Sequence, residues 1–181
     1  MQRSDSDPVS DSIVTVGQYR VKTMSLTWPK LLLLWEQLKK FRALFSDLTR
    51  GDLENFIKYV VNEHTFWLEI YKAKELVGII SLENMHLVVD AEAHVFFMDH
   101  NLSDKVPVSR ATVVWLFDNF PFQRLTVQVP ERHYATLRFV KNLGFKSEGR
   151  KRQAVLINGK WFDVYLFGIL RTEVMSLCRS Y

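Results

Sequence analysis

The spacing of apolar residues changes near residue 62, and this change constrains the fold more than any other feature. Before it, apolar side chains recur every three or four residues in Pro29–Phe45 and Asp52–Val61, which predicts two amphipathic helices. After it, they alternate in Thr65–Tyr71, Leu76–Leu82 and Ala91–Met98, which predicts three strands. Two such helices bury their apolar faces most readily against the sheet that these strands form.

The remaining chain mixes the two patterns. Asn158-Gly159 stands between two alternating segments and is a strong signal for a hairpin turn. Gly144 is suited to end the preceding helix, because glycine tolerates a positive φ. Asp52 or Thr49 is expected to cap the second helix. The further elements that we expect are strands at Tyr19–Thr23, Arg124–Val129, Phe145–Ile157 and Trp161–Leu170, and helices at Pro107–Asn119 and Arg132–Leu143.

The resulting order, β-α-α-β-β-β-α-β-α-β-β, predicts an α/β or α+β class. The first twelve residues are polar, and we expect residues 1–12 to form a disordered tail before a single domain at 13–181. No apolar run approaches the roughly 20 residues that span a bilayer, and the N-terminus lacks the apolar core of a secretory signal. The single cysteine, Cys178, excludes an internal disulfide. We therefore expect a cytoplasmic protein with no membrane partner.

The C-terminal string LGFKSEGRKRQAVLINGKWFDVYLFGILR carries a resemblance to a known family. It resembles the GNAT acyltransferases, in particular the branch that includes the ribosomal-protein N-terminal acetyltransferases. The shared pattern is LGF-x-x-EG-x-x-R, a glycine turn, and D-x-x-x-x-x-x-L-x-R. Ala91-Glu92 is similar to the opening of that family's fourth strand, with His94 in place of a glycine. The residues that fit the C-terminal pattern are Gly144, Phe145, Glu148, Gly149, Arg152, Gly159, Asp163, Leu170 and Arg171.

The resemblance implies a mixed, mostly antiparallel sheet of about seven strands, with the fourth and fifth strands splayed apart and helices on both faces. It also implies an N-acetyltransferase that moves an acetyl group from acetyl-CoA to a primary amine of a protein N-terminus or a small molecule. In this family the pantetheine arm pairs with the backbone edge of the fourth strand. The diphosphate lies at the start of the following helix, where unpaired N–H groups and the helix dipole attract anions.

The phosphate loop departs from the family pattern. Its two glycines align with Ser103 and Lys105, Asp104 adds a negative charge, and Pro107 removes a backbone donor. Lys105 and Arg110 are basic side chains that we expect to compensate. The positions that the resemblance assigns to the cofactor are Phe96, Phe97, Met98, Asn101, Ser103, Lys105, Val106, Arg110, His133 and Thr136.

The catalytic assignment rests on the predicted fourth strand. Glu92 matches the family's glutamate and is our first choice of general base. His94 lies two residues later on the same strand face, and imidazole titrates in the useful range. A solvated strand face or a structural pair is the alternative interpretation of Glu92 and His94. Phe139 occupies the position where many relatives carry a tyrosine that serves as the general acid.

Three functional hypotheses follow. We favour an active acetyltransferase over a GNAT-fold protein that has lost catalysis and serves as a binding or structural module, and a protein partner or homodimer stays open for either. The net charge of +4 and the basic segment Lys146–Arg152 suggest a third hypothesis, nucleic-acid binding, which we do not expect as the main role. The five histidines show no metal-ligand spacing, so we expect no metal site.

Overall fold

The computed structural model describes residues 12–39, 52–62, 64–86, 88–98, 101 and 103–178, with side chains described up to residue 174. The helices are α1 (Trp28–Leu38), α2 (Leu53–Val60), α3 (Val106–Asn119), α4 (Tyr134–Asn142) and α5 (Arg171–Cys178), and a short 3-10 helix, Ser103–Lys105, leads into α3. The strands are β1 (Val14–Val16), β2 (Tyr19–Thr23), β3 (Phe66–Lys72), β4 (Glu75–His86), β5 (Asp90–Phe97), β6 (Arg124–Pro130), β7 (Lys146–Ile157) and β8 (Lys160–Leu170).

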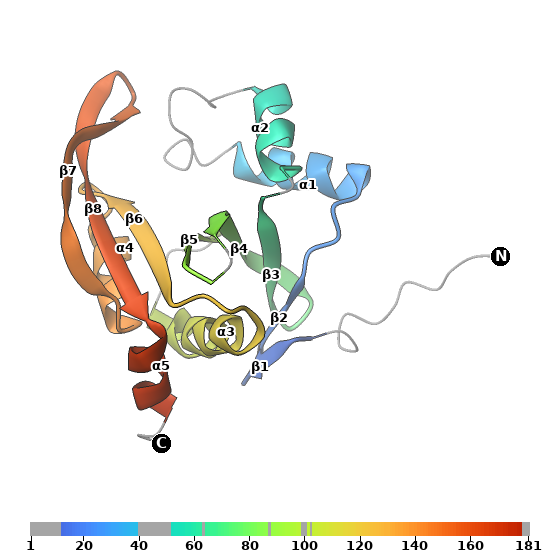
Figure 1. Cartoon of the computed structure of the whole chain (residues 1–181). Coiled ribbons are helices and arrows are strands. Elements are labelled where there is room, and N and C mark those ends of the chain that lie inside the picture. Colours follow the sequence, from blue (N-terminus) through green and yellow to red (C-terminus); the bar gives the residue numbers. More distant parts are fainter. Residues whose placement is uncertain are drawn as a thin grey trace.

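The strands form one eight-stranded sheet in the order β1-β2-β3-β4-β5-β6-β8-β7 (Figure 1). All neighbours are antiparallel except β5 and β6, which run parallel. The expectation of a mixed, mostly antiparallel sheet is therefore confirmed. The strand absent from the prediction is β1, a three-residue edge strand that turns into β2 through Gly17, whose φ of +56° suits glycine.

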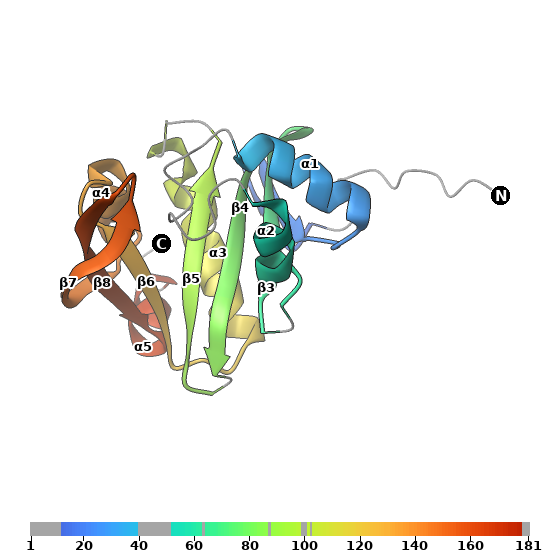
Figure 2. The same cartoon turned by 90° about the horizontal axis from the view of Figure 1, so that it is seen from above.

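Helices cover both faces of the sheet, as expected. Figure 2 shows α1 and α2 in front of β3 and β4, with α3 behind them. Side chains alternate along β5, so Ala91 and Phe97 pack in the larger core with α3 and α4, whereas Phe96 contacts the smaller core beneath α1 and α2. Glu92 and His94 share the face of Phe96, which places the two predicted catalytic side chains on the α1–α2 face.

The parallel strands β5 and β6 pair only at their beginnings. Three residue pairs join them, from Asp90 with Arg124 to Glu92 with Thr126. The Thr126 hydroxyl adds a hydrogen bond of 3.2 Å to the Ala91 carbonyl. Beyond this point β5 pairs with β4 alone and β6 with β8 alone. The expected splay is therefore present, and its apex lies at Glu92.

Most element boundaries agree with the prediction to within a few residues. Asp52 caps α2, because its side chain accepts hydrogen bonds from the backbone N–H groups of Glu54 and Asn55. Gly144 follows α4 with a φ of +102°, as predicted. The helix expected over Pro29–Phe45 is observed as α1, and its last residues lie outside the described part of the chain, as do Thr49 and most of the expected tail.

Two extensions were not predicted. Strand β4 continues to His86, four residues beyond its expected end at Leu82. The chain also ends in helix α5, which follows β8 directly. None of the helices described is long and apolar enough to cross a membrane.

Candidate active site at the apex of the splay

A cluster of titratable side chains lies on the α1–α2 face at the apex. Glu83 on β4 is the cross-strand partner of Glu92 on β5, so their side chains project from the same face. The Nε2 atom of His94 lies 3.3 Å from Oε1 of Glu92 and 3.7 Å from Oε1 of Glu83. Both carboxylates are largely shielded from solvent, with 16% and 14% of their side-chain surfaces exposed, whereas His94 is 40% exposed. The imidazole is therefore the accessible member of the cluster.

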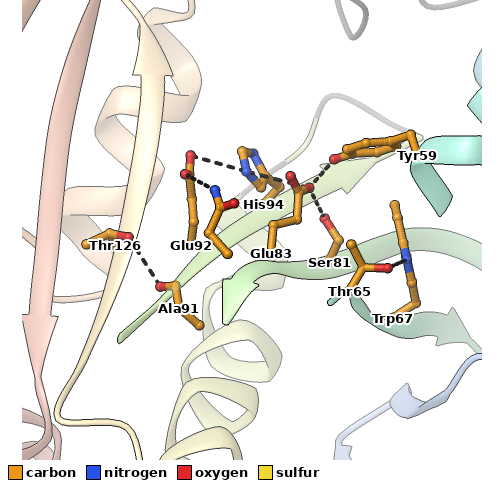
Figure 3. A network of polar contacts seen from close by, with 10 residues as sticks. Tyr59, Thr65, Trp67, Ser81, Glu83, Ala91, Glu92, His94 and Thr126 are labelled. Carbon is orange, nitrogen blue, oxygen red and sulfur yellow. Dashed lines mark hydrogen bonds and ion pairs between the residues drawn. The ribbon is translucent and has the colours of Figure 1, made fainter. Parts of the chain in front are cut away.

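Glu83 receives its hydrogen bonds on one oxygen. Its Oε1 accepts the Ser81 hydroxyl at 3.0 Å and the hydroxyl of Tyr59, which reaches down from α2 (Figure 3). The Tyr59 ring packs edge-on against Trp67, with 5.8 Å between ring centroids. An aromatic wall from α2 and β3 thus stands beside the carboxylate.

Glu92 is held on both oxygens. His94 lies beside its Oε1, and the Asn84 side chain donates to Oε2 at 3.3 Å. Asn84 adopts a φ of +48° where the β4–β5 register shifts, and this bulge directs its amide at Glu92. Gln128 of β6 also hydrogen-bonds to Glu92, and Lys151 of β7 donates to Gln128 at 3.2 Å. A polar network therefore crosses the apex from α2 to β7.

The environment shifts the pKa values of three of these groups. Burial alone would raise the pKa of Glu92, but the hydrogen bond and charge of His94, with the amides of Gln128 and Asn84, lower it. Burial alone would lower the pKa of His94, but Glu92 and Glu83 raise it. Burial, followed by the hydrogen bond to Glu83, raises the pKa of Tyr59. The ionised carboxylates and the protonated imidazole thus stabilise one another.

Beyond the apex, the edge of β5 that faces β6 has no strand partner within the described part of the chain. The Met98 N–H donates to the Val77 carbonyl at 2.9 Å, so Met98 and Phe96 direct their backbone groups toward β4. Val95 and Phe97 direct theirs toward the diverging β6. Of Phe96, Phe97 and Met98, which the sequence analysis expected to offer this edge, only Phe97 directs its backbone groups toward β6. Val95 does so as well, although the sequence analysis did not propose it.

The start of α3 differs from a glycine phosphate loop. The Asn101 amide donates to Asp104 at 2.9 Å and accepts from the Ser103 hydroxyl at 2.7 Å. Lys105 was expected to meet phosphates with its side chain, but that side chain is 1% exposed. Its ammonium contacts the Asn101 carbonyl and lies 5.4 Å from the centroid of the Phe97 ring.

Arg110 also contacts protein where we expected phosphate. Its guanidinium donates to the Asn142 carbonyl at 2.7 Å and so links α3 to the C-terminal end of α4. Lys105 and Arg110 therefore hold neighbouring elements together in this arrangement. Ser103 is exposed and Val106 is half-buried, so the backbone N–H groups at the start of α3 are what the loop can still offer an anion.

The start of α4 faces the same end of the splay, because α3 follows β5 and α4 follows β6, and these two strands are parallel. His133 precedes α4, and its Nε2 is buried without a hydrogen-bond partner among the described residues. Burial, aided by the charge of Arg132, lowers the pKa of His133. Thr136 is half-buried one turn later. Phe139 is buried against Phe97, with 5.8 Å between ring centroids, and has no proton to donate.

The sequence analysis proposed Glu92 and His94, which the structure brings together in one cluster. It did not include Glu83, Tyr59 and Gln128, which lie in the same cluster. Glu83 follows the strand predicted at Leu76–Leu82, and it continues the alternation of β4 past Leu82. Tyr59 lies within the helix predicted at Asp52–Val61. No local pattern pairs it with Glu83, which lies 24 residues away.

The parallel pair that diverges within an otherwise antiparallel sheet, with helix starts at its open end, defines the fold of the GNAT acyltransferases. A family model described as an acetyltransferase (GNAT) domain matches residues 36–166, so the chain belongs to this family. A comparison of the sequence with curated proteins gives no match.

Solved structures share the fold at low sequence identity. RimL, a ribosomal L7/L12 alpha-N-protein acetyltransferase solved with coenzyme A, has a TM-score of 0.74 and 14% identity over 88% of this chain and 98% of its own. A spermidine N-acetyltransferase from Vibrio cholerae, solved with CoA and spermine, has a TM-score of 0.72 and 17% identity over 87% and 98%. A ribosomal-protein-S5-alanine acetyltransferase from Vibrio fischeri has a TM-score of 0.67 and 14% identity over 87% and 96%.

Proposed function

We propose that this protein transfers an acetyl group from acetyl-CoA to the nitrogen of a primary amine. The observation that carries the proposal is the coincidence of the splay apex with the Glu83–Glu92–His94 cluster. The unpaired edge of β5 suits the pantetheine arm, and the cluster lies at the inner end of that edge, on the face covered by α1 and α2. The acceptor amine would then approach from the α1–α2 face.

His94 is the proposed general base, and Glu92 is its positioning residue. A primary amine with a pKa of about 10 is almost fully protonated at neutral pH, so it must lose a proton before it attacks. Glu92 is a poor proton acceptor because three donors stabilise its ionised form. His94 is accessible and accepts the proton when its imidazole is neutral, and Glu92 fixes the ring orientation.

The protons of the transfer reaction are all accounted for without a side chain that acts as general acid. The amine nitrogen forms a bond to the thioester carbonyl carbon, and the proton that it loses passes to His94. The carbon–sulfur bond breaks and the sulfur leaves as a thiolate. The nitrogen then loses its second proton, which passes through water to the departing thiolate. A free thiol has a pKa of about 8.5, so the thiolate is an acceptable leaving group. The absence of a hydroxyl at Phe139 is therefore compatible with turnover.

The residues present fit acetyl-CoA better at its pantetheine end than at its phosphate end. The unpaired backbone of Val95 and Phe97 matches the amides of pantetheine. At the start of α3 the backbone around Ser103 and Val106 is the candidate for the diphosphate, while the carboxylate of Asp104 opposes it. We expect binding to be weaker than a glycine loop would give.

That phosphate end also favours a second candidate function, a GNAT-fold module that binds a partner without catalysis. Asn101, Ser103 and Asp104 satisfy one another in a loop that in the family's pattern serves phosphate. The module hypothesis predicts that acetyl-CoA does not bind, and the acetyltransferase hypothesis predicts that it does.

The test is calorimetric titration with acetyl-CoA, followed by a thiol-release assay with a panel of primary amines. We expect binding, amine-dependent thiol release, and loss of at least about tenfold in kcat on His94→Gln, as general-base catalysis contributes about 100-fold or more. His86→Gln is the matched control, because His86 is exposed and pairs with Asp90 at 3.5 Å near the other end of β5. Absence of binding at millimolar acetyl-CoA would reject the acetyltransferase and leave the module.

A further inference from the structure

The two carboxylate oxygens of Glu83 differ in their hydrogen bonds. Tyr59, Ser81 and His94 all approach its Oε1 atom. Its Oε2 atom accepts no hydrogen bond from any residue in the described part of the chain. Oε2 is not fully buried, so a ligand with N–H groups can reach it and form charge-assisted hydrogen bonds there.

Glu92 shows the contrast. His94, Asn84 and Gln128 together engage both of its oxygens. A ligand that binds Glu92 must displace one of these donors, whereas a ligand that binds Oε2 of Glu83 displaces none. The free hydrogen-bonding capacity of the cluster therefore belongs to Glu83.

The charge balance of the cluster also favours a cation. The cluster holds two carboxylates and one imidazole, so its net charge is negative whether the imidazole is neutral or protonated. Since the carboxylates are only 16% and 14% exposed, solvent screens this charge weakly. A ligand bearing a positive charge offsets this negative charge, and a neutral ligand does not. The Tyr59–Trp67 wall beside Glu83 offers an apolar surface for the carbon chain of such a ligand.

We propose that Glu83 determines acceptor specificity by binding the protonated amine through Oε2, so that the acceptors are aliphatic primary amines, which are charged at neutral pH, and not aromatic amines or alcohols. This inference rests on the proposed acetyl transfer and deepens it. The bound ammonium lies beside His94, which removes its proton when neutral. Glu83 thus binds the substrate, while Glu92 keeps its positioning role.

The test uses n-butylammonium as the probe and the His94 imidazole as the reporter, observed by NMR. We expect a saturable chemical-shift change in the wild type, weakened at least tenfold in Glu83→Gln, and no such change with n-butanol, which has the same chain without the charge. Glu75→Gln is the matched control, because Glu75 is an exposed glutamate at the start of the same strand. Equal affinity in wild type and Glu83→Gln, or an equal response to n-butanol, would overturn the proposal.

A second measurement separates this inference from the proposed function. The binding experiment needs no acetyl-CoA, so it reports on Glu83 whether or not transfer occurs. In the transfer assay we expect Glu83→Gln to lower the ratio of kcat/KM for n-butylamine to that for aniline at least tenfold, mainly through KM. An unchanged ratio in an active enzyme refutes the inference alone. Absence of transfer with intact butylammonium binding refutes the acetyltransferase alone.

Discussion

Lys30→Met tests how α1 is held on the sheet above the acceptor face. Glu69 on β3 is 2% exposed, and its carboxylate pairs with the ammonium of Lys30 from α1. Lys22 of β2 lies 3.8 Å from the other carboxylate oxygen, and Lys30 also donates to the Tyr71 hydroxyl at 3.4 Å. Methionine keeps a long unbranched side chain at position 30 but removes the charge. The Glu69 carboxylate would then keep only the weaker contact with Lys22.

The expected loss of stability follows from that residual contact. Removing one partner of a buried ion pair costs about 3–5 kcal/mol, because the other charge stays buried without compensation. Since Lys22 still offers partial compensation, we place the loss at the lower end, about 3 kcal/mol. For a chain of this size that corresponds to a fall in Tm of about 6–12 °C.

Urea unfolding followed by tryptophan fluorescence measures this loss of stability, since Trp35 of α1 is buried in the smaller core beneath α1 and α2. The double variant Lys30→Met with Glu69→Met should recover most of it, because two apolar side chains replace the pair. Lys58→Met, which breaks an exposed pair with Glu54, serves as the control and should behave like the wild type. A loss below about 1 kcal/mol in Lys30→Met, or a double variant as unstable as the single one, would refute the reasoning.

Four further outcomes are expected. The transfer rate should rise with pH as His94 becomes neutral, and His94→Gln should abolish that rise. The pKa of His94 is raised on folding, so protonated His94 stabilises the fold fully below about pH 6.5, and this stabilisation disappears as pH rises through the folded pKa. Urea unfolding of wild type and His94→Gln across this pH range measures the effect. Gly78→Ala should destabilise by about 1–3 kcal/mol in urea unfolding, because the new methyl group would lie 2.8 Å from the Phe96 carbonyl oxygen. Asp104→Asn should tighten acetyl-CoA binding about two- to fivefold at low salt in calorimetry, because a negative charge leaves the start of α3.

Much of the fold followed from local patterns. The change of apolar spacing predicted α1, α2 and the meander of β3, β4 and β5, because burial on one face imposes those periods. Asn158-Gly159 predicted the last hairpin for a local reason, its turn geometry. Strand β1 is too short to show a period, and α5 follows β8 without a turn residue to separate them.

The site was predictable only where one strand carried it. Glu92 and His94 lie two residues apart on β5, so alternation placed them together. Glu83 and Tyr59 reach the same point from β4 and α2, and only the register and the helix packing bring them there. The inward turn of Lys105 likewise depends on the Asn101 carbonyl and the Phe97 ring, which no sequence spacing specifies.

The three residue pairs between β5 and β6 have a mechanical consequence. Among the described residues they are the sole strand pairing between β1–β5 and β6–β8, and the Arg110–Asn142 and Phe97–Phe139 contacts add to it. A ligand lying along the open edge of β5 would add contacts between the two halves of the sheet, β1–β5 and β6–β8. Bound acetyl-CoA would then stabilise the relative position of the two halves, and its release would make the gap between β5 and β6 easier to open for product release.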